Sequence, residues 1–279
     1  MEQTKGYFRL KGKIWGLNNK EPFTNGTGTI RSLSIGIQSS KENSNYVQIG
    51  KFASGTLNVK IKGEGMEEVL EIGEQQAIDK VKEVFKDGDS VYVNLRVEPN
   101  TFTGKLDYLV SQIYIEKEPI DFNADNFEEV NELVQTIVVT EKPESGSVKG
   151  GLVSFNGQLL ELDLKLDDEI VNEYFQDNIK VGDLVPVSIY VFNKPIYEGE
   201  GESTERTTLK GKIKKSGGQK IVDRVLELQI SDVDTSNIKS KLYDREEIRQ
   251  ARELTEESKN NTSTKTPSQE IKNDDDLPY

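Results

Sequence analysis

The chain has 279 residues, 49 of them acidic and 36 basic, so its formal net charge is −13 at neutral pH. It contains neither cysteine nor histidine, which excludes disulfides, thiolate zinc sites, catalytic thiols and imidazole acid–base chemistry. Oxygen-ligand Mg²⁺ sites, lysine nucleophiles and carboxylate pairs would each need a spatial cluster that the sequence does not display. We therefore expect a protein that is not an enzyme and that holds no cofactor or metal.

The length fits two domains of ordinary size. The apolar content of 34% is low, yet Leu, Ile and Val alternate regularly along most of the chain, which favours folded domains with a polar appendage. No apolar run reaches the roughly 18 residues that span a bilayer, and the N-terminal residues lack the apolar core of a signal peptide. We expect a cytoplasmic protein that does not associate with membranes.

The first predicted domain covers residues 1–117 and begins with strands. Residues 5–17 alternate so that cationic and aromatic side chains face one side and apolar side chains face the other. Further alternations follow, separated by Gly, Asn and Ser clusters typical of turns, at residues 33–37, 47–49 and 57–61.

The rest of this domain is predicted to contain one helix followed by two strands. Residues 74–86 carry a helical apolar stripe that stops before Asp87-Gly88. Residues 91–97 and 109–115 return to the strand period. Strands, one helix and two more strands are the order of a small Greek-key barrel of the OB type, with its helix between the third and fourth strands.

The second half, residues 133–235, repeats this order. Residues 180–185 resemble residues 86–91 at a shift of 94, and strand and helix patterns surround them, at residues 160–166, 168–178 and 225–233. A match this short also arises by chance. The predicted fold class is mainly β, with two OB-like barrels in tandem joined by an acidic linker, residues 118–132.

The C-terminal part has little to bury. Residues 236–257 are highly charged and are interpreted as an exposed helix. Residues 258–279 are interpreted as a flexible, disordered tail because apolar residues are nearly absent from it.

The negative total hides two basic regions. Residues 1–62 hold ten basic and three acidic side chains, and a second basic run extends from Arg206 to Arg224. Any one such run is more often a solvated face than a binding site. Two runs on predicted strands, with aromatic residues beside them, favour a nucleic-acid surface.

Binding single strands without sequence preference needs cations along the backbone and aromatic faces for unpaired bases. The first barrel supplies both on predicted outward strand positions and in the two loops that flank an OB groove, namely Tyr7, Arg9, Lys11, Lys13, Trp15, Lys20, Phe23, Tyr46, Lys60, Lys62, Tyr92, Arg96, Phe102 and Lys105. A single aromatic residue in this set is as often a cap on the core.

The second barrel is a weaker candidate, because Glu161 and Asp163 are predicted to face outward and would repel phosphate. Its favourable residues alternate on one side of a strand, namely Lys210, Lys212 and Lys214. This barrel is expected to extend the track weakly or to contact proteins.

The last six residues are Asp274, Asp275, Asp276, Leu277, Pro278 and Tyr279. Acids, Pro and a terminal ring at the end of a polar tether suit capture by an apolar pocket with a basic rim. This ending resembles the acidic tip of bacterial single-stranded DNA-binding proteins, with Tyr279 in place of Phe. The resemblance implies an OB barrel that binds single strands and a tip that recruits replication, recombination and repair proteins.

Two barrels in one chain depart from that family, whose members have one shorter OB domain per subunit. This departure favours a version carried by a bacteriophage or mobile element, in the host cytosol, that uses the host tip as an adaptor. It leaves both monomer and dimer open. The alternative is a β-rich phage structural or adaptor protein that uses the tip only for protein contacts. Catalysis would need a carboxylate set such as residues 167–169 or 274–276, which have simpler uses as a helix start and as the tip.

Overall fold

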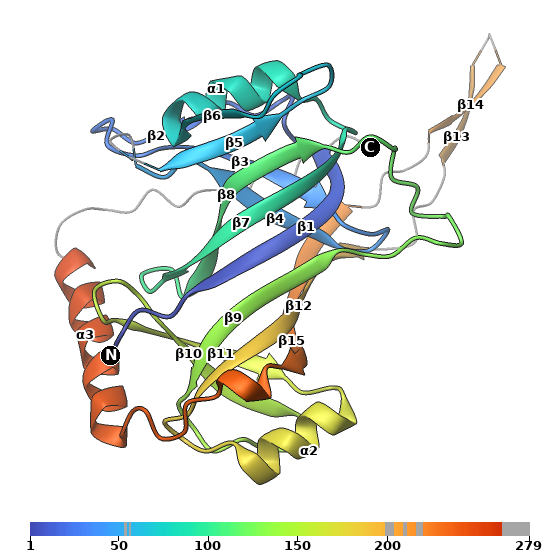
Figure 1. Ribbon diagram of the computed structural model, residues 1–279. Coiled ribbons are helices and arrows are strands. Elements are labelled where there is room, and N and C mark those ends of the chain that lie inside the picture. Colours follow the sequence, from blue (N-terminus) through green and yellow to red (C-terminus); the bar gives the residue numbers. More distant parts are fainter. Residues whose placement is uncertain (53–54, 56, 199–203, 209–210, 216–219, 264–279) are drawn as a thin grey trace.

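The computed structural model describes the chain except residues 53–54, 56, 199–203, 209–210, 216–219 and 264–279 (Figure 1). For the described segments between residues 197 and 223, only the backbone is considered. The fold is mainly β, as predicted. Thirteen strands join in one sheet, and β13 (Thr204–Thr208) and β14 (Gly211–Lys215) pair as a separate ribbon.

Five strands close the first barrel, in the cycle β1–β3–β4–β8–β7–β1. Their bounds are β1 (Gly6–Trp15), β3 (Arg31–Gln38), β4 (Ser44–Ile49), β7 (Ser90–Asn100) and β8 (Lys105–Ile115). Only β4 and β8 in this cycle are parallel. This is the predicted OB-like Greek-key order, with α1 (Glu74–Val84) between the third and fourth barrel strands.

Additions to this barrel lie at its rim. The short β2 (Phe23–Thr24) pairs with β3, and the hairpin of β5 (Asn58–Lys62) and β6 (Leu70–Gly73) continues the sheet beyond β8. The helix α1 contacts β5, β3 and β4 at the end of the barrel seen at the top of Figure 1.

Period-two alternation builds the core. In β1, Phe8, Leu10 and Ile14 are buried, whereas the residues between them face outward or are glycine. The helix α1 buries Ala77, Ile78 and Val81 on one face. The predicted inward and outward sides of these elements are therefore the observed ones.

The second barrel has the same cycle, β9–β10–β11–β15–β12–β9, again with one parallel pair, β11 with β15. The bounds are β9 (Asn131–Val139), β10 (Ser147–Val153), β11 (Leu159–Lys165), β12 (Leu184–Glu198) and β15 (Lys220–Val233). Helix α2 (Glu169–Asn178) follows the third strand, and Asp168 caps it by accepting a hydrogen bond from the Val171 N–H.

Local details repeat at the predicted offset of 94. A β-bulge lies between Asn94 and Leu95 in β7, and another lies between Ser188 and Ile189 in β12. At each bulge a serine hydroxyl from the neighbouring strand donates to the carbonyl before it: Ser111 to Asn94 at 2.9 Å, and Ser231 to Ser188 at 3.2 Å. The two halves are thus one structural unit, used twice.

The barrels join through their first strands. β1 and β9 pair antiparallel over residues 6–10 and 131–135, and Phe8 lies opposite Leu133. Phe8 pairs with Leu95 in its own barrel, and Leu133 pairs with Ile189, the counterpart of Leu95. Equivalent residues therefore meet at the centre of the junction, as in a two-fold arrangement.

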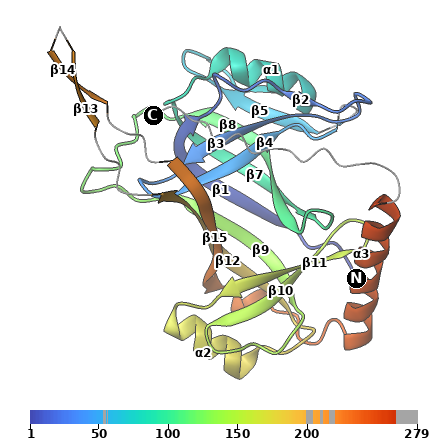
Figure 2. The same cartoon turned by 180° about the vertical axis from the view of Figure 1, so that it is seen from behind.

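The C-terminal helix differs from the predicted exposed helix at residues 236–257. Thr235–Asn237 form a short 3₁₀ turn, η1, and α3 spans Arg245–Ser263. The helix therefore includes residues 258–263, which were predicted to belong to the flexible tail. One face of α3 is buried against Val138, Val153 and Leu159 of the second barrel through Ile248 and Ala251. The sequence does not reveal the apolar stripe of α3, because only a few apolar residues lie among many charged ones. Figure 2 shows α3 beside the second barrel and the N-terminus.

Candidate nucleic-acid interface

The structure divides the predicted surface of the first barrel into two parts. The outward residues of β1 do share one face. However, Arg9 forms an ion pair with Glu132, and the Lys11 Nζ lies 3.0 Å from a Glu116 carboxylate oxygen. Tyr7 is 46% exposed beside Arg9. The N-terminal half of this face is therefore balanced by acids.

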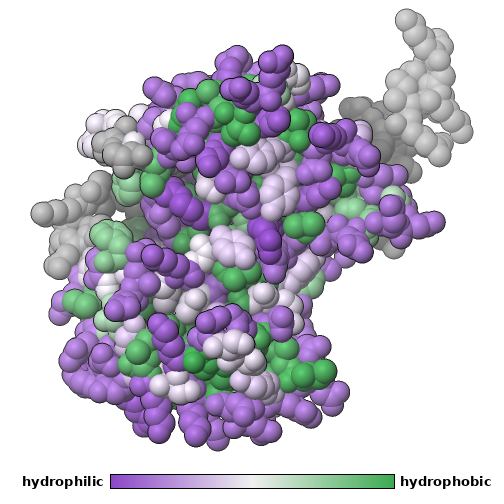
Figure 3. Space-filling view, viewed as in Figure 1, coloured by the Kyte–Doolittle hydropathy of each residue, from purple (hydrophilic) through white to green (hydrophobic). Residues whose placement is uncertain are grey.

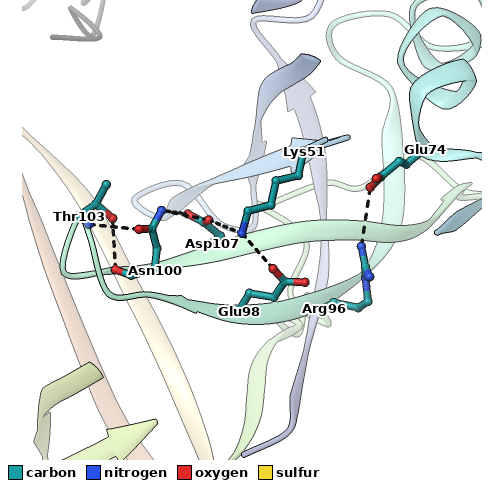
Figure 4. Close-up of polar contacts among 7 residues, drawn as sticks. All are labelled: Lys51, Glu74, Arg96, Glu98, Asn100, Thr103 and Asp107. Carbon is teal, nitrogen blue, oxygen red and sulfur yellow. Dashed lines mark hydrogen bonds and ion pairs between the residues drawn. The ribbon is translucent and has the colours of Figure 1, made fainter. Parts of the chain in front are cut away.

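The outer face of β7 and β8 carries further balanced charge. Arg96 lies 3.9 Å from Glu74, whose burial raises its pKa although Arg96 opposes that shift. Lys51 bridges Glu98 at 2.9 Å and Asp107 at 3.1 Å, and Asn100 donates to Asp107 at 3.2 Å (Figure 4). This network stabilises the β7–β8 hairpin. Its two cations, Lys51 and Arg96, are already paired with carboxylates. Tyr92 lies opposite Lys11 in the β1–β7 register.

A different arrangement exists where β1, β3 and β4 lie side by side. Trp15, Gly36 and Tyr46 stand directly opposite one another across these three strands. The indole ring of Trp15 lies against Gly36, where any Cβ would overlap it. The Trp15 and Tyr46 ring centroids are 5.0 Å apart in an edge-to-face arrangement. A glycine inside a strand often marks such a close approach.

Two cations lie over these rings. The Lys20 Nζ lies 5.2 Å from the Tyr46 centroid and 5.9 Å from the Trp15 centroid, within cation–π range. Burial lowers the pKa of Lys20. The Arg224 guanidinium lies 5.1 Å from the Tyr46 centroid. We call Trp15, Lys20, Gly36, Tyr46 and Arg224 the aromatic platform.

Arg224 reaches the platform from the second barrel. Its Nε donates to the Asn193 side-chain oxygen at 2.8 Å, and its terminal nitrogen donates to the Ser44 carbonyl at 3.2 Å. The Asn193 backbone N–H donates in turn to the Asn43 side chain at 2.8 Å. These bonds fix the long β12–β15 hairpin beside the start of β4, so the platform is built from both barrels.

Two of the three platform strands, β3 and β4, carry no charge on their outer side. The outward positions of β3 and β4 are Ser32, Ser34, Gly36, Gln38, Ser44, Tyr46 and Gln48. Ser and Gln side chains can exchange hydrogen bonds with phosphate or base edges. No acid on these two strands opposes a nucleic-acid backbone.

The equivalent face of the second barrel is unlike this one. The register places Thr140, Lys149 and Asp163 in the row where the first barrel has Trp15, Gly36 and Tyr46. Lys149 is paired with Glu141 at 3.5 Å and Asp163 at 4.0 Å.

Helix α3 closes over part of this second face. Arg252 forms an ion pair with Glu161 at 2.6 Å, and the Thr255 hydroxyl donates to the Leu159 carbonyl at 3.1 Å. The second barrel therefore uses this surface to hold its own helix.

The remaining predicted residues, except Lys13, lie away from the platform. Phe23 is 50% exposed in β2, and Phe102 is 60% exposed in the β7–β8 loop, near the exposed Lys105. Lys60 and Lys62 lie on β5, beyond β8 from β4, and Lys60 is 4.0 Å from Glu71. Lys13 lies beside the platform on β1, with its Nζ 5.2 Å from the Phe122 ring.

Some predicted residues fall where less is described. Lys212 and Lys214 belong to β14, opposite Thr207 and Glu205, and only their backbone is described. Lys210 and the tip, residues 274–279, lie outside the described residues. Sequence reasoning missed Gly36, and it placed Arg224 in the second basic run without selecting it as a site residue. The glycine between Ile35 and Ile37 was a usable signal for the first, whereas the second requires knowing that β15 reaches β4.

A comparison with protein families decides the affiliation of the chain. The model of the YorF family matches residues 5–265. The chain belongs to the YorF family. This YorF-family match includes both barrels and the whole of α3. A comparison with curated protein sequences gives no match.

Among solved structures, the YorF-family chain is similar to an engineered deletion mutant of the single-stranded DNA binding protein from Thermus aquaticus. The two are 13% identical, with a TM-score of 0.41, over 72% of this chain and 100% of that one. A similarity of this size does not extend to function. In the described part of the YorF-family chain, no three acidic side chains group as metal ligands, and no helix is long and apolar enough to cross a membrane.

Proposed function

We propose that this protein binds single-stranded DNA without strong sequence preference, through the aromatic platform of its first barrel. The observation that carries the proposal is the pair of rings, Trp15 and Tyr46, with Lys20 and Arg224 at 5.1 to 5.9 Å and no charged residue on the outer side of β3 and β4. Stacking on such rings is sequence-tolerant because every base has a π face, and it contributes roughly 1 to 3 kcal/mol per base.

Each component of the platform has a role in this proposal. The two rings receive unstacked bases, while Lys20 and Arg224 neutralise adjacent phosphates. Both cations are held over the rings before DNA arrives, so little side-chain entropy is lost on binding. Gly36 leaves room for Trp15 to lie close to the sheet. Phe23, Phe102 and Lys105, which are exposed at the rim, extend the contact at the two loops.

The net charge of −13 does not oppose this binding, because residues 1–62, which supply Trp15, Lys20 and Tyr46, contain ten basic and three acidic side chains. Exposed charges farther away than about a Debye length, roughly 8 Å at physiological salt, are largely screened. The second barrel does not contribute an equivalent platform, since Lys149 and Asp163 occupy those positions. Its proposed contributions are Arg224 and the fixed β12–β15 hairpin.

The proposal includes a second function for the chain end. We infer that residues 274–279 recruit replication, recombination or repair proteins, including those of a bacterial host if the chain is encoded by a phage or mobile element. Three carboxylates followed by Leu, Pro and Tyr suit a pocket with a basic rim. A pull-down from bacterial lysate with the full chain, compared with a chain that ends at Asn273, tests this part separately.

Fluorescence of Trp15, the only tryptophan, tests DNA binding directly. Titration with poly(dT) should quench it, and added salt should reverse the quenching with a slope of roughly −0.7 per phosphate contact. Tyr46→Leu should weaken binding by about 5-fold to 100-fold. Phe155→Ala is the matched control, because Phe155 is 86% exposed on the second barrel.

Two results would count against the proposal. Absence of quenching and of any polarisation change with labelled poly(dT) would remove DNA binding and favour the structural or adaptor role. An equal loss from Tyr46→Leu and Phe155→Ala would show that the platform is not the binding surface.

A further inference from the structure

A shallow depression of about 320 Å³ lies at the junction of the two barrels, next to the platform. The β3–β4 turn, the segment between the barrels and β12 line it, through Lys41, Phe122, Phe127, Tyr190, Phe192 and Lys194. Ligand pockets commonly measure about 300 to 1,000 Å³, so this one suits a small flat group.

Four aromatic rings surround the depression in two edge-to-face pairs. The Tyr190 and Phe192 centroids are 4.4 Å apart, and those of Phe122 and Phe127 are 5.4 Å apart. All four side chains are only partly buried. Contiguous exposed apolar patches often mark interaction sites, and these four partly exposed rings, which come from two segments, form such a patch.

Hydrogen bonds hold the wall rigidly. Glu129 accepts from the hydroxyls of Ser39 and Tyr190, both at 2.5 Å, and from the Asn43 side-chain nitrogen at 3.1 Å. Asn43 also donates to the Val191 carbonyl at 3.0 Å. Burial, together with the Glu129 hydrogen bond, raises the pKa of Tyr190, so this hydroxyl stays protonated and keeps donating.

The charges around the depression balance. Lys194 lies 3.0 Å from Glu42 and 5.2 Å from the Phe192 centroid. Lys13 lies over the Phe122 ring. Hydrogen bonds from Asn123 lower the pKa of Asp121, and the nearby charges of Lys13 and Lys41 lower it further. Glu129 is already engaged by four donors, one each from Ser39, Asn43, Asn131 and Tyr190. The depression thus offers π faces without a strong net field.

We propose that this depression receives one unstacked base of the same DNA strand that lies on the platform. The proposal rests on the proposed function. Continuity supports it, because Lys13 and Trp15 are neighbours on the outer side of β1, and Asn43 of the depression wall precedes Tyr46 in the same hairpin. A neutral flat base fits balanced charge and aromatic walls. A segment with several carboxylates, such as residues 274–276, would instead need an excess of cations.

Photocrosslinking locates the base without depending on affinity. The full chain is mixed with oligo(dT) that carries 5-iodouracil at single positions, irradiated, digested and mapped by mass spectrometry. We expect adducts on peptides that contain Trp15 or Tyr46 at one position. At a neighbouring position, we expect adducts on peptides that contain Phe127, Tyr190 or Phe192.

Phe192→Leu keeps an apolar side chain but removes the π face. It should abolish the second set of adducts and weaken binding by about 5-fold to 100-fold, while the adducts at Trp15 persist. Its thermal unfolding curve, compared with that of the unchanged chain, separates misfolding from loss of the contact. If Phe192→Leu does not fold, Lys194→Ala, which leaves the rings in place, should still show the second set.

Three outcomes would overturn the inference. Adducts confined to the platform would leave the proposed function standing and remove the depression as a base site. No adducts and no binding at all would remove both. Adducts in the depression for a chain that ends at Asn273, but none there for the full chain, would show that the tip is the occupant of the depression in the intact protein.

Discussion

Replacing Gly36 by alanine perturbs the platform through a single methyl group. The new Cβ would overlap the indole of Trp15, and ordinary van der Waals contact begins at about 3.4 Å, so the ring must move by more than an ångström. Trp15 lies on the outer side of the sheet and can swing toward solvent. Overpacking usually costs about 1 to 3 kcal/mol, and the better strand propensity of alanine offsets part of that cost.

The effect on DNA binding should exceed the effect on folding. Displacing the indole removes stacking on one base, which corresponds to a loss of roughly 1 to 3 kcal/mol, or about 5-fold to 100-fold in Kd. Polarisation of labelled poly(dT) at constant salt measures this loss, and the emission maximum of Trp15 reports the ring's new surroundings.

A double-mutant cycle tests the reasoning. In a Trp15→Leu background, Gly36→Ala should have little further effect, because its action passes through the indole ring. If Gly36→Ala weakens binding equally in both backgrounds, the proposed contact between Gly36 and Trp15 does not control the platform.

The other predictions concern charge and the C-terminal helix. The lowered pKa of Lys20 should make DNA affinity begin to fall at a lower pH than the range near 10.4 where an ordinary lysine loses its proton. Lys20→Arg should remove this early part of the fall in a titration from neutral to alkaline pH. Arg224→Ala should weaken poly(dT) binding, because Arg224 lies over the Tyr46 ring, whereas Lys11→Ala, at a position outside the platform, should change affinity much less in the same assay. Ile248→Ala should cost about 2 to 4 kcal/mol of stability by denaturant titration while leaving poly(dT) affinity unchanged, and a parallel loss of affinity would show that α3 supports the platform.

Much of the fold could be predicted from local pattern. Alternation in residues 5–17 gave the inward side of β1, and the Gly88 and Gly182 turns, with φ near 90° in both, end the same helix–turn unit in each half. Which strands pair with one another was harder to predict, because the β1–β9 pairing joins residues more than a hundred positions apart. The amphipathic face of α3 was missed because Ile248 and Ala251 are isolated among charges.

The candidate site was predicted only in part for a related reason. Parity placed Arg9 and Lys11 on the outer face, but it does not reveal that Glu132 and Glu116 lie across from them in space. It did select Trp15 and Tyr46, since both carry an aromatic ring on an outward strand position. What remained hidden was the position of Arg224 over the Tyr46 ring, because Arg224 belongs to the second barrel.

Pairing the two first strands inside one polypeptide has a thermodynamic consequence. Subunits that meet through an edge strand separate on dilution, so their joint surfaces depend on protein concentration. Here Phe8 and Leu133 remain neighbours at any dilution, because the covalent chain keeps the local concentration of one half near the other high. Because the two halves belong to one chain, their outer faces can differ. The first barrel carries the aromatic platform, whereas the same face of the second barrel is partly covered by α3.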